Sequence, residues 1–239
     1  MNCPIGELRA TVFSAPIVFD PKNVQRITEL LNPSDEYRAI PLNQIQHHPS
    51  QEPVVLEWEM VSDKNRCKLH FGPQKIDVIK STFNAGEHSE DDFCKESCEL
   101  FFRIIDRFML SVTRIAYAPV YTPDWNADLK RDSFNQAVYN KNEYQGHPLS
   151  NILFKQVYIV PILLNRRKFD FNYVAEASEG QSIVHDVKKN SLTITNMLNM
   201  SLDINSRQGV GYVFEKEEMN EFFSNAAEYG RQFLEYYLG

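Results

Sequence analysis

The residues that could do chemistry in this chain are scattered, and none of them forms a known catalytic motif. His47 and His48 precede a proline in a polar stretch, so their ring nitrogens could bind a metal, but no third ligand follows at a regular spacing. The pair His185-Asp186 could be an oriented base, yet no nucleophile stands beside it. P-loop, GxGxxG, HExxH and GxSxG patterns are all missing. We therefore predict no catalytic residue, no metal site and no cofactor.

Several other clusters have a structural interpretation beside the chemical one. Cys94 and Cys98 lie one helical turn apart, as metal ligands can, but two partly buried thiols on a helix explain the spacing as well. Glu57 and Glu59 have the spacing of two carboxylates on the solvent face of a strand. The basic run 165–168 is typical of an exposed hairpin turn, with phosphate binding as the alternative. In each case the structural interpretation is the simpler one.

A long aromatic segment is the candidate binding surface. Residues 119–150 separate two predicted strands, and long segments of this kind in compact domains often carry function. Tyrosine and tryptophan are enriched at recognition hot spots. We therefore predict a binding site made of Tyr121, Trp125, Tyr144 and His147. The alternative is that these rings cover one end of the core.

Composition excludes several classes of protein. The chain has 239 residues, of which 43% are hydrophobic and 24% charged, as in an ordinary globular protein. Its net charge of −7 disfavours direct binding to a nucleic-acid backbone. Four cysteines are too few for a disulfide scaffold. Because no signal segment and no long apolar run occur, we expect a cytoplasmic protein without a membrane segment.

The predicted elements divide the chain into two similar parts. A helix is expected over 89–110, because Ser89 is a good N-cap, acidic residues follow it and apolar residues recur at helical spacing. A second amphipathic helix closes the chain over 215–237. Alternating apolar residues and short turns before each helix predict antiparallel strands. In the second part we expect these strands over 154–164, 168–175, 183–187 and 192–205.

These elements predict an α+β fold of two tandem halves. Each half runs strand, helix, antiparallel meander and long helix, with the helices packed on one face of curved antiparallel sheets. The halves span residues 1–110 and 111–239, and the second contains the excursion 119–150. They share a layout and no convincing residue identity, and one continuous domain is the alternative.

This order of elements resembles that of the TATA-binding-protein-like and helix-grip folds, where helices cover one face of a curved sheet. Acidic residues at predicted outer positions, namely Glu57, Glu59, Asp77 and Asp203, argue against DNA binding through such a sheet. The chain also resembles a sporadically distributed, uncharacterised bacterial family. That resemblance lies in a strand with Arg114 and Tyr117 and in the Asp-Ile-Asn strand 203–205. It implies no activity.

Three functions are compatible with the sequence. We expect a non-catalytic binding or assembly protein that recognises a protein partner or a second copy of itself, such as an accessory subunit of a bacterial or phage system. One alternative is a metal-dependent hydrolase, a nuclease or esterase, whose site forms only in the fold. The other is a small-molecule binder in a cleft between helix and sheet, beside Phe101 or Phe222.

Overall fold

The computed structural model describes residues 3–42, 44–45, 54–55, 57–81, 89–123, 153–186 and 191–238. The elements of the first part of the chain are β1 (Ile5–Phe13), α1 (Pro21–Thr28), the short 3-10 helix η1 (Pro33–Asp35), β2 (Arg38–Pro41), β3 (Gln44–Ile45), β4 (Val54–Val55), β5 (Trp58–Ser62), β6 (Cys67–Phe71), β7 (Lys75–Ser81) and α2 (Glu90–Phe108). Those of the second part are β8 (Arg114–Tyr121), β9 (Leu153–Leu164), β10 (Arg167–Asp186), β11 (Ser191–Ser206) and α4 (Lys216–Leu238).

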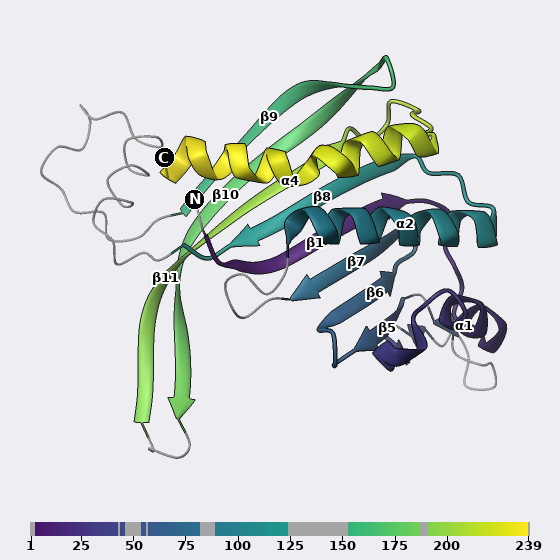
Figure 1. Ribbon diagram of the computed structural model, residues 1–239, viewed down its shortest axis with the longest axis horizontal. Helices are drawn as coiled ribbons and strands as arrows, with labels where there is room; N and C mark the ends of the chain where they lie inside the picture. The colour runs from purple at the N-terminus through teal and green to yellow at the C-terminus, as the bar shows by residue number, and fades with distance from the viewer. Residues whose placement is uncertain are drawn as a thin grey trace, which may run out of the picture.

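One antiparallel sheet of nine strands organises the described part of the chain (Figure 1). Its strand order is β2-β5-β6-β7-β1-β8-β11-β10-β9, and β3 and β4 form a separate small pair. The two long helices, α2 and α4, lie on one face of this sheet. The α+β class and the antiparallel sheet with helices on one face are therefore confirmed.

The pairing of β1 with β8 joins the strands of the two predicted halves into one sheet. Nine-residue β1 pairs with β7 on one side and with β8 on the other, with Thr11 opposite Ala116. We expected a separate sheet under each helix, and this detail is corrected. The physical reason is that an unpaired β1 or β8 would expose a long row of backbone donors and acceptors, which the pairing satisfies.

Helix α2 begins and ends as its sequence predicts. The Ser89 hydroxyl accepts a hydrogen bond from the Asp92 amide at 3.3 Å, which caps the helix N-terminus. At the other end Met109 adopts a left-handed conformation, with φ of 50°, and terminates the helix. The buried side of α2 carries Phe93, Leu100, Phe101 and Ile104. Burial of such side chains stabilises the fold by about 2 kcal/mol each.

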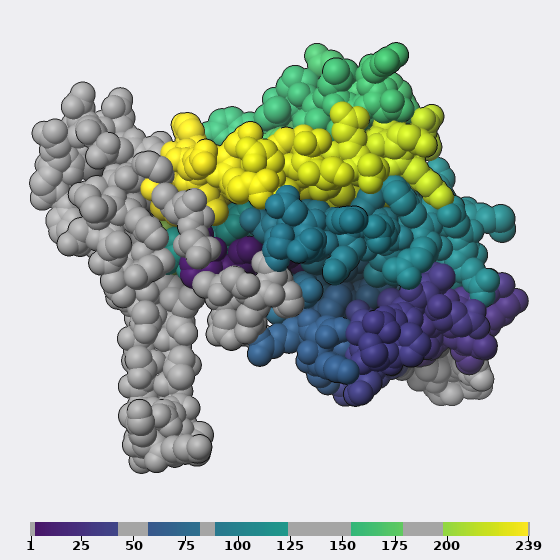
Figure 2. All heavy atoms as spheres, in the orientation of Figure 1, coloured from purple at the N-terminus to yellow at the C-terminus, as the bar shows by residue number. Residues whose placement is uncertain are grey.

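Helices α2 and α4 run antiparallel and in contact, and they lie side by side over the middle of one face of the sheet (Figure 2). Phe101 and Phe223 pack ring against ring between the two helices, with centroids 5.7 Å apart. Ion pairs link the start of each helix to the end of the other, Asp91 to Arg231 and Asp106 to Lys216. No helix among the described residues is long and apolar enough to cross a membrane.

Strands β10 and β11 form an arm that extends beyond the body of the sheet (Figure 1). Sequence analysis places a polar break after residue 175, but β10 continues without interruption to Asp186. Its backbone pairs with β11 as far as Asp186 opposite Ser191. The prediction of a break was wrong because a two-stranded ribbon is held by its ladder of backbone hydrogen bonds, so it needs no buried face there.

Candidate functional site

The face of the sheet opposite the two long helices carries a groove of about 460 Å³. We call this surface the open face. Small side chains of β8, at Ala116 and Ala118, lie under the groove, and longer side chains of β1, β10 and β11 flank it. The strand register explains this arrangement: Arg9 lies opposite Ala118, and Asn205 opposite Ala116. Alternation of side chains in each strand sends Leu8, Ala10, Leu202 and Ile204 to the core instead.

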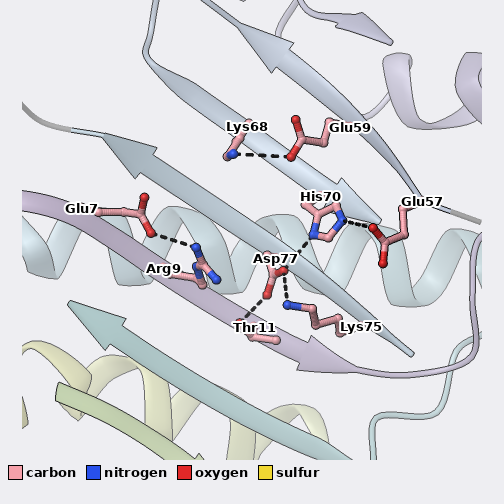
Figure 3. A network of polar contacts seen from close by, with 9 residues as sticks. All are labelled: Glu7, Arg9, Thr11, Glu57, Glu59, Lys68, His70, Lys75 and Asp77. Carbon is pink, nitrogen blue, oxygen red and sulfur yellow. Dashed lines mark hydrogen bonds and ion pairs between the residues drawn. The ribbon is translucent and has the colours of Figure 1, made fainter. Parts of the chain in front are cut away.

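On the side of the first-half strands, the acidic side chains that Figure 3 labels each lie beside a basic or histidine side chain. Arg9 contacts Glu7 at 2.9 Å, and Lys68 contacts Glu59 at 3.4 Å. On the other side of the groove Lys155 pairs with Glu176. These pairs leave little net charge, although several acids are present.

Asp77 is the centre of this network. Its side chain is 1% exposed and contacts Lys75 Nζ at 2.8 Å, His70 Nδ1 at 3.1 Å and the Thr11 hydroxyl at 2.6 Å. Burial alone would raise the pKa of Asp77, but hydrogen bonds from His70, Lys75 and Thr11 outweigh it and lower that pKa to about 2. Glu57 approaches the other ring nitrogen of His70 at 3.8 Å. Asp77 is thus a structural carboxylate with its donors already in place.

Asp203 and Arg114 differ from the other charged residues of the groove. In the part of the chain that the structure describes, neither of them has an ion-pair partner within 4.0 Å. The pKa of the Asp203 carboxyl is raised, chiefly by burial and further by the charge of Glu176. A hydrogen bond from Asn205 and the charge of Arg114 oppose that rise without cancelling it. Asp203 thus retains its proton to a higher pH than an exposed aspartate does.

Arg114 is fixed by neutral groups. Its Nε donates to the Ser206 carbonyl at 3.0 Å and one Nη donates to Asn205 Oδ1 at 3.3 Å. Its guanidinium lies over the Phe13 ring, 4.2 Å from the centroid. Burial lowers the pKa of Arg114. A guanidinium held in this way keeps further N–H donors for an anion, and the planar fork matches phosphate or carboxylate.

Of the four predicted binding residues, the described part of the chain contains Tyr121 alone. Tyr121 lies at the end of β8, fully buried, and its hydroxyl donates to Glu90 at 2.7 Å, so it belongs to the core between sheet and helices. Trp125, Tyr144 and His147 lie outside the described residues, as do most of the excursion 119–150 and His47, His48 and His88. For these three residues the binding site stays a prediction.

The other sequence candidates are placed as follows. Cys94 and Cys98 are buried in α2, and burial raises the pKa of Cys98 to about 12, so both thiols stay protonated. Among the described residues, no group of three or more His, Cys, Asp or Glu is arranged to hold a metal ion. Asn165 and Arg166 form the tight β9–β10 turn, both with positive φ.

The helix side of the sheet has a hollow as well. It measures about 550 Å³ and lies where the end of α1 faces α2, lined by Phe93 and Leu100 but also by charged residues such as Glu96, Arg103 and Lys80. Phe101 and Phe222, beside which the sequence allows a ligand cleft, are both fully buried in the core.

The outer face of the sheet is not the acidic surface that its sequence predicts. Glu57, Glu59, Asp77 and Asp203 are the acids predicted at outer positions. All four are on or near the open face, but Glu59 and Asp77 are neutralised by basic partners and Glu57 approaches His70. The open face is therefore close to charge balance and not acidic.

Sequence reasoning missed the groove as a site. The alternation of Arg9 and Thr11 with Leu8, Ala10 and Val12 was the available signal, because it places the polar side chains on the face away from the core. The proximity of Arg114 to Asp203 could not be found in this way, since it depends on the pairing of β8 with β11.

This chain has a weak structural likeness to a known protein. No family model and no curated protein sequence matches this chain. A solved structure of a rolling circle replication initiator protein from Geobacillus stearothermophilus matches with a TM-score of 0.34 and 11% identity, over 98% of this chain and 84% of that one. A TM-score this low carries no argument about the function of this chain.

The prediction of a non-catalytic binding or assembly protein is nevertheless corrected. The prediction depended on an aromatic binding loop, and its first residue, Tyr121, is a core residue.

Proposed function

We propose that the groove on the open face is a hydrolytic active site for phosphate esters, in which Arg114 holds the phosphate and Asp203 is the general acid. One observation carries this proposal: Asp203 and Arg114 line the same groove and are its two charged residues without an ion-pair partner in the described part of the chain. Every other charge there is already matched by a neighbour.

The environment of Asp203 suits a proton donor. A general acid must carry its proton near the working pH, and burial raises the pKa of Asp203 in that direction. The contrast with Asp77 in the same sheet is informative, because Asp77 has three donors and stays ionised. Environment therefore assigns different roles to two chemically identical carboxyls.

The environment of Arg114 suits a phosphate. Its contacts to Ser206, Asn205 and Phe13 fix the guanidinium without neutralising it. Charge-assisted bonds from a prepositioned guanidinium would stabilise the negative charge that develops on the phosphoryl oxygens. Arg9, which also lines the groove, is already paired with Glu7.

The reaction balances with these groups alone. The oxygen of a water molecule forms a bond to phosphorus while the bond from phosphorus to the ester oxygen breaks. Asp203 gives its proton to the departing oxygen, and the attacking water releases a proton that restores the Asp203 carboxyl. The products are an alcohol and a phosphate with one ester bond fewer.

Hydrolysis of bis(p-nitrophenyl) phosphate by the full chain tests this proposal. We expect release of p-nitrophenol, and a loss of roughly a hundredfold in rate for Asp203→Asn, as is typical when a general acid is removed. Asp106→Asn is the matched control, because Asp106 is an exposed acid on α2, on the helix side of the sheet. It should change the rate by less than about twofold. A wild-type protein that does not hydrolyse the ester would contradict the proposal.

Two predictions from the sequence accompany this proposal. The groove lies over β1 and β8, where the proposed halves 1–110 and 111–239 meet. The layout of the sheet supports a tandem arrangement, because in each part the first strand pairs with the last strand of its own meander, β1 with β7 and β8 with β11. A cytoplasmic location remains an expectation from the sequence.

A further inference from the structure

A second hollow, of about 410 Å³, adjoins the groove at the end where β8 begins. It shares Phe13 and Arg114 with the groove, so the two hollows lie side by side at these residues. The rest of its lining comes from Ser14, Gln74, Thr113 and the loop that follows β11, residues 207–209 and 211–213. We call this hollow the end pocket.

The end pocket differs from the groove in its charge. Two arginines, Arg114 and Arg207, line it, and none of its lining residues is an aspartate or glutamate. The acid closest to Arg207 is Asp170, at 4.0 Å, and the Arg207 side chain is 45% exposed. The groove, in contrast, is lined by four acidic residues beside four basic ones (Glu7, Asp77, Glu176 and Asp203; Arg9, Lys75, Arg114 and Lys155). The end pocket is thus a positive region next to a balanced one.

The loop 207–213 adds backbone donors. Gly209 and Gly211 have positive φ of 82° and 72°, a conformation that favours glycine, and open space surrounds the position of a Cβ at each. The N–H groups of Gly211, Tyr212 and Val213 donate to no protein group within the described residues. Free backbone N–H groups beside arginines are a common arrangement for binding phosphate.

We infer that the end pocket is a second phosphate subsite, so that the substrate carries another phosphate group next to the ester in the groove. Arg207 and the loop 209–213 would hold this second phosphate, and Arg114 would lie between the two. This inference rests on the proposed hydrolase function. A nucleoside diphosphate and a phosphodiester chain share this chemistry, and the groove and end pocket together have the size of ligand sites of that kind.

Binding of inorganic pyrophosphate to the full chain, measured by isothermal titration calorimetry, tests the subsite. Arg207→Gln should weaken binding by roughly tenfold, about the loss expected for one charge-assisted contact. Arg38→Gln is the matched control, because Arg38 is also an exposed arginine with an acidic neighbour, Asp63, but lies on β2 at the far edge of the sheet. It should leave binding unchanged. Equal binding by Arg207→Gln and wild type, or equal weakening by both variants, would overturn the subsite.

The two possible sources of the second phosphate are separated by repeating the titration with ADP and with a thymidine trinucleotide. Loss of affinity in Arg207→Gln for either probe supports the subsite and identifies the source, whereas no loss for either overturns it. Asp203→Asn separates this inference from the proposed function. If the wild type binds pyrophosphate through Arg207 but hydrolyses no ester, the subsite stands and the hydrolase fails. If hydrolysis depends on Asp203 but pyrophosphate binding is the same in Arg207→Gln and in the wild type, the hydrolase stands and the subsite fails.

Discussion

Asp77 and Asp203 lie on the same face of one sheet, on either side of the β1–β8 pair, and their pKa values are shifted in opposite directions. Asp77 is 1% exposed and has Lys75, His70 and Thr11 as donors. Asp203 is half-buried, and its direct hydrogen bond is to the neutral side chain of Asn205. Burial alone therefore does not decide the protonation state of a carboxyl; the hydrogen-bond donors around it do.

Substitution of Asp77 should have the largest effect on stability. Asp77→Asn removes the negative charge that Lys75 and His70 face in a buried position, so we expect a loss of about 3 kcal/mol in the free energy of unfolding. Urea denaturation at pH 7 measures this value. Glu59→Gln is the control on the same face, and loss of its 3.4 Å pair with Lys68 should cost less than about 1 kcal/mol. Equal costs for both variants would show that Asp77 is an ordinary surface acid.

On the face of the sheet that the helices cover, polar side chains of the sheet form hydrogen bonds to a helix, whereas on the open face they bond to one another. Glu90 of α2 accepts hydrogen bonds from Tyr117 and Tyr121, each at 2.7 Å. A Cβ at Gly230 of α4 would lie 2.1 Å from the Tyr121 hydroxyl and 3.1 Å from Glu90 Oε1. Gly230 is therefore explained by the close approach of α4 to this cluster.

Gly230→Ala should destabilise the protein by about 2 kcal/mol, because the methyl group displaces the Tyr121 hydroxyl. Tyr121→Phe removes that hydroxyl and its bond to Glu90, at a cost of about 1 kcal/mol. In the Tyr121→Phe background, Gly230→Ala should then cost about 1 kcal/mol less than in the wild type, as a double-mutant cycle of thermal or urea unfolding measures. Additive effects of the two substitutions would contradict the predicted contact.

The sequence predicted the faces of the strands better than it predicted their neighbours. Alternation correctly placed Glu57 and Glu59 on one face of the strand and Trp58 and Met60 on the other. The predicted helix 89–110 matches α2 closely. Both predictions succeed because the patterns are local in the sequence. The β1–β8 pair, which creates the groove, joins residues about a hundred positions apart and leaves no local pattern. Tyr121 shows the same limit, since an aromatic residue at the end of a strand is compatible with a core or with a binding surface.

Substitution of Asp203 should have the smallest effect on the free energy of unfolding. The pH dependence of this effect should be opposite in sign to that of Asp77. The folded-state pKa of Asp77 is lowered, so its contribution to stability is present above the unfolded pKa and is lost as the pH falls towards about 2. The folded-state pKa of Asp203 is raised, so the folded state binds the proton more tightly. Its contribution is therefore present at low pH and is lost as the pH rises through the folded pKa.

Asp203→Asn should for this reason be slightly more stable than the wild type at pH 7 and should lose that advantage at pH 3. The difference in the free energy of unfolding should stay below about 1 kcal/mol, because the Asp203 side chain is only half-buried. Asp77→Asn should behave in the opposite way, with its largest deficit at pH 7 and a smaller one at pH 3. Urea unfolding of both variants and the wild type at the two pH values measures the comparison. If Asp203→Asn were less stable than the wild type at pH 7, Asp203 would be a structural carboxylate like Asp77, and it would not be free to donate a proton to a substrate.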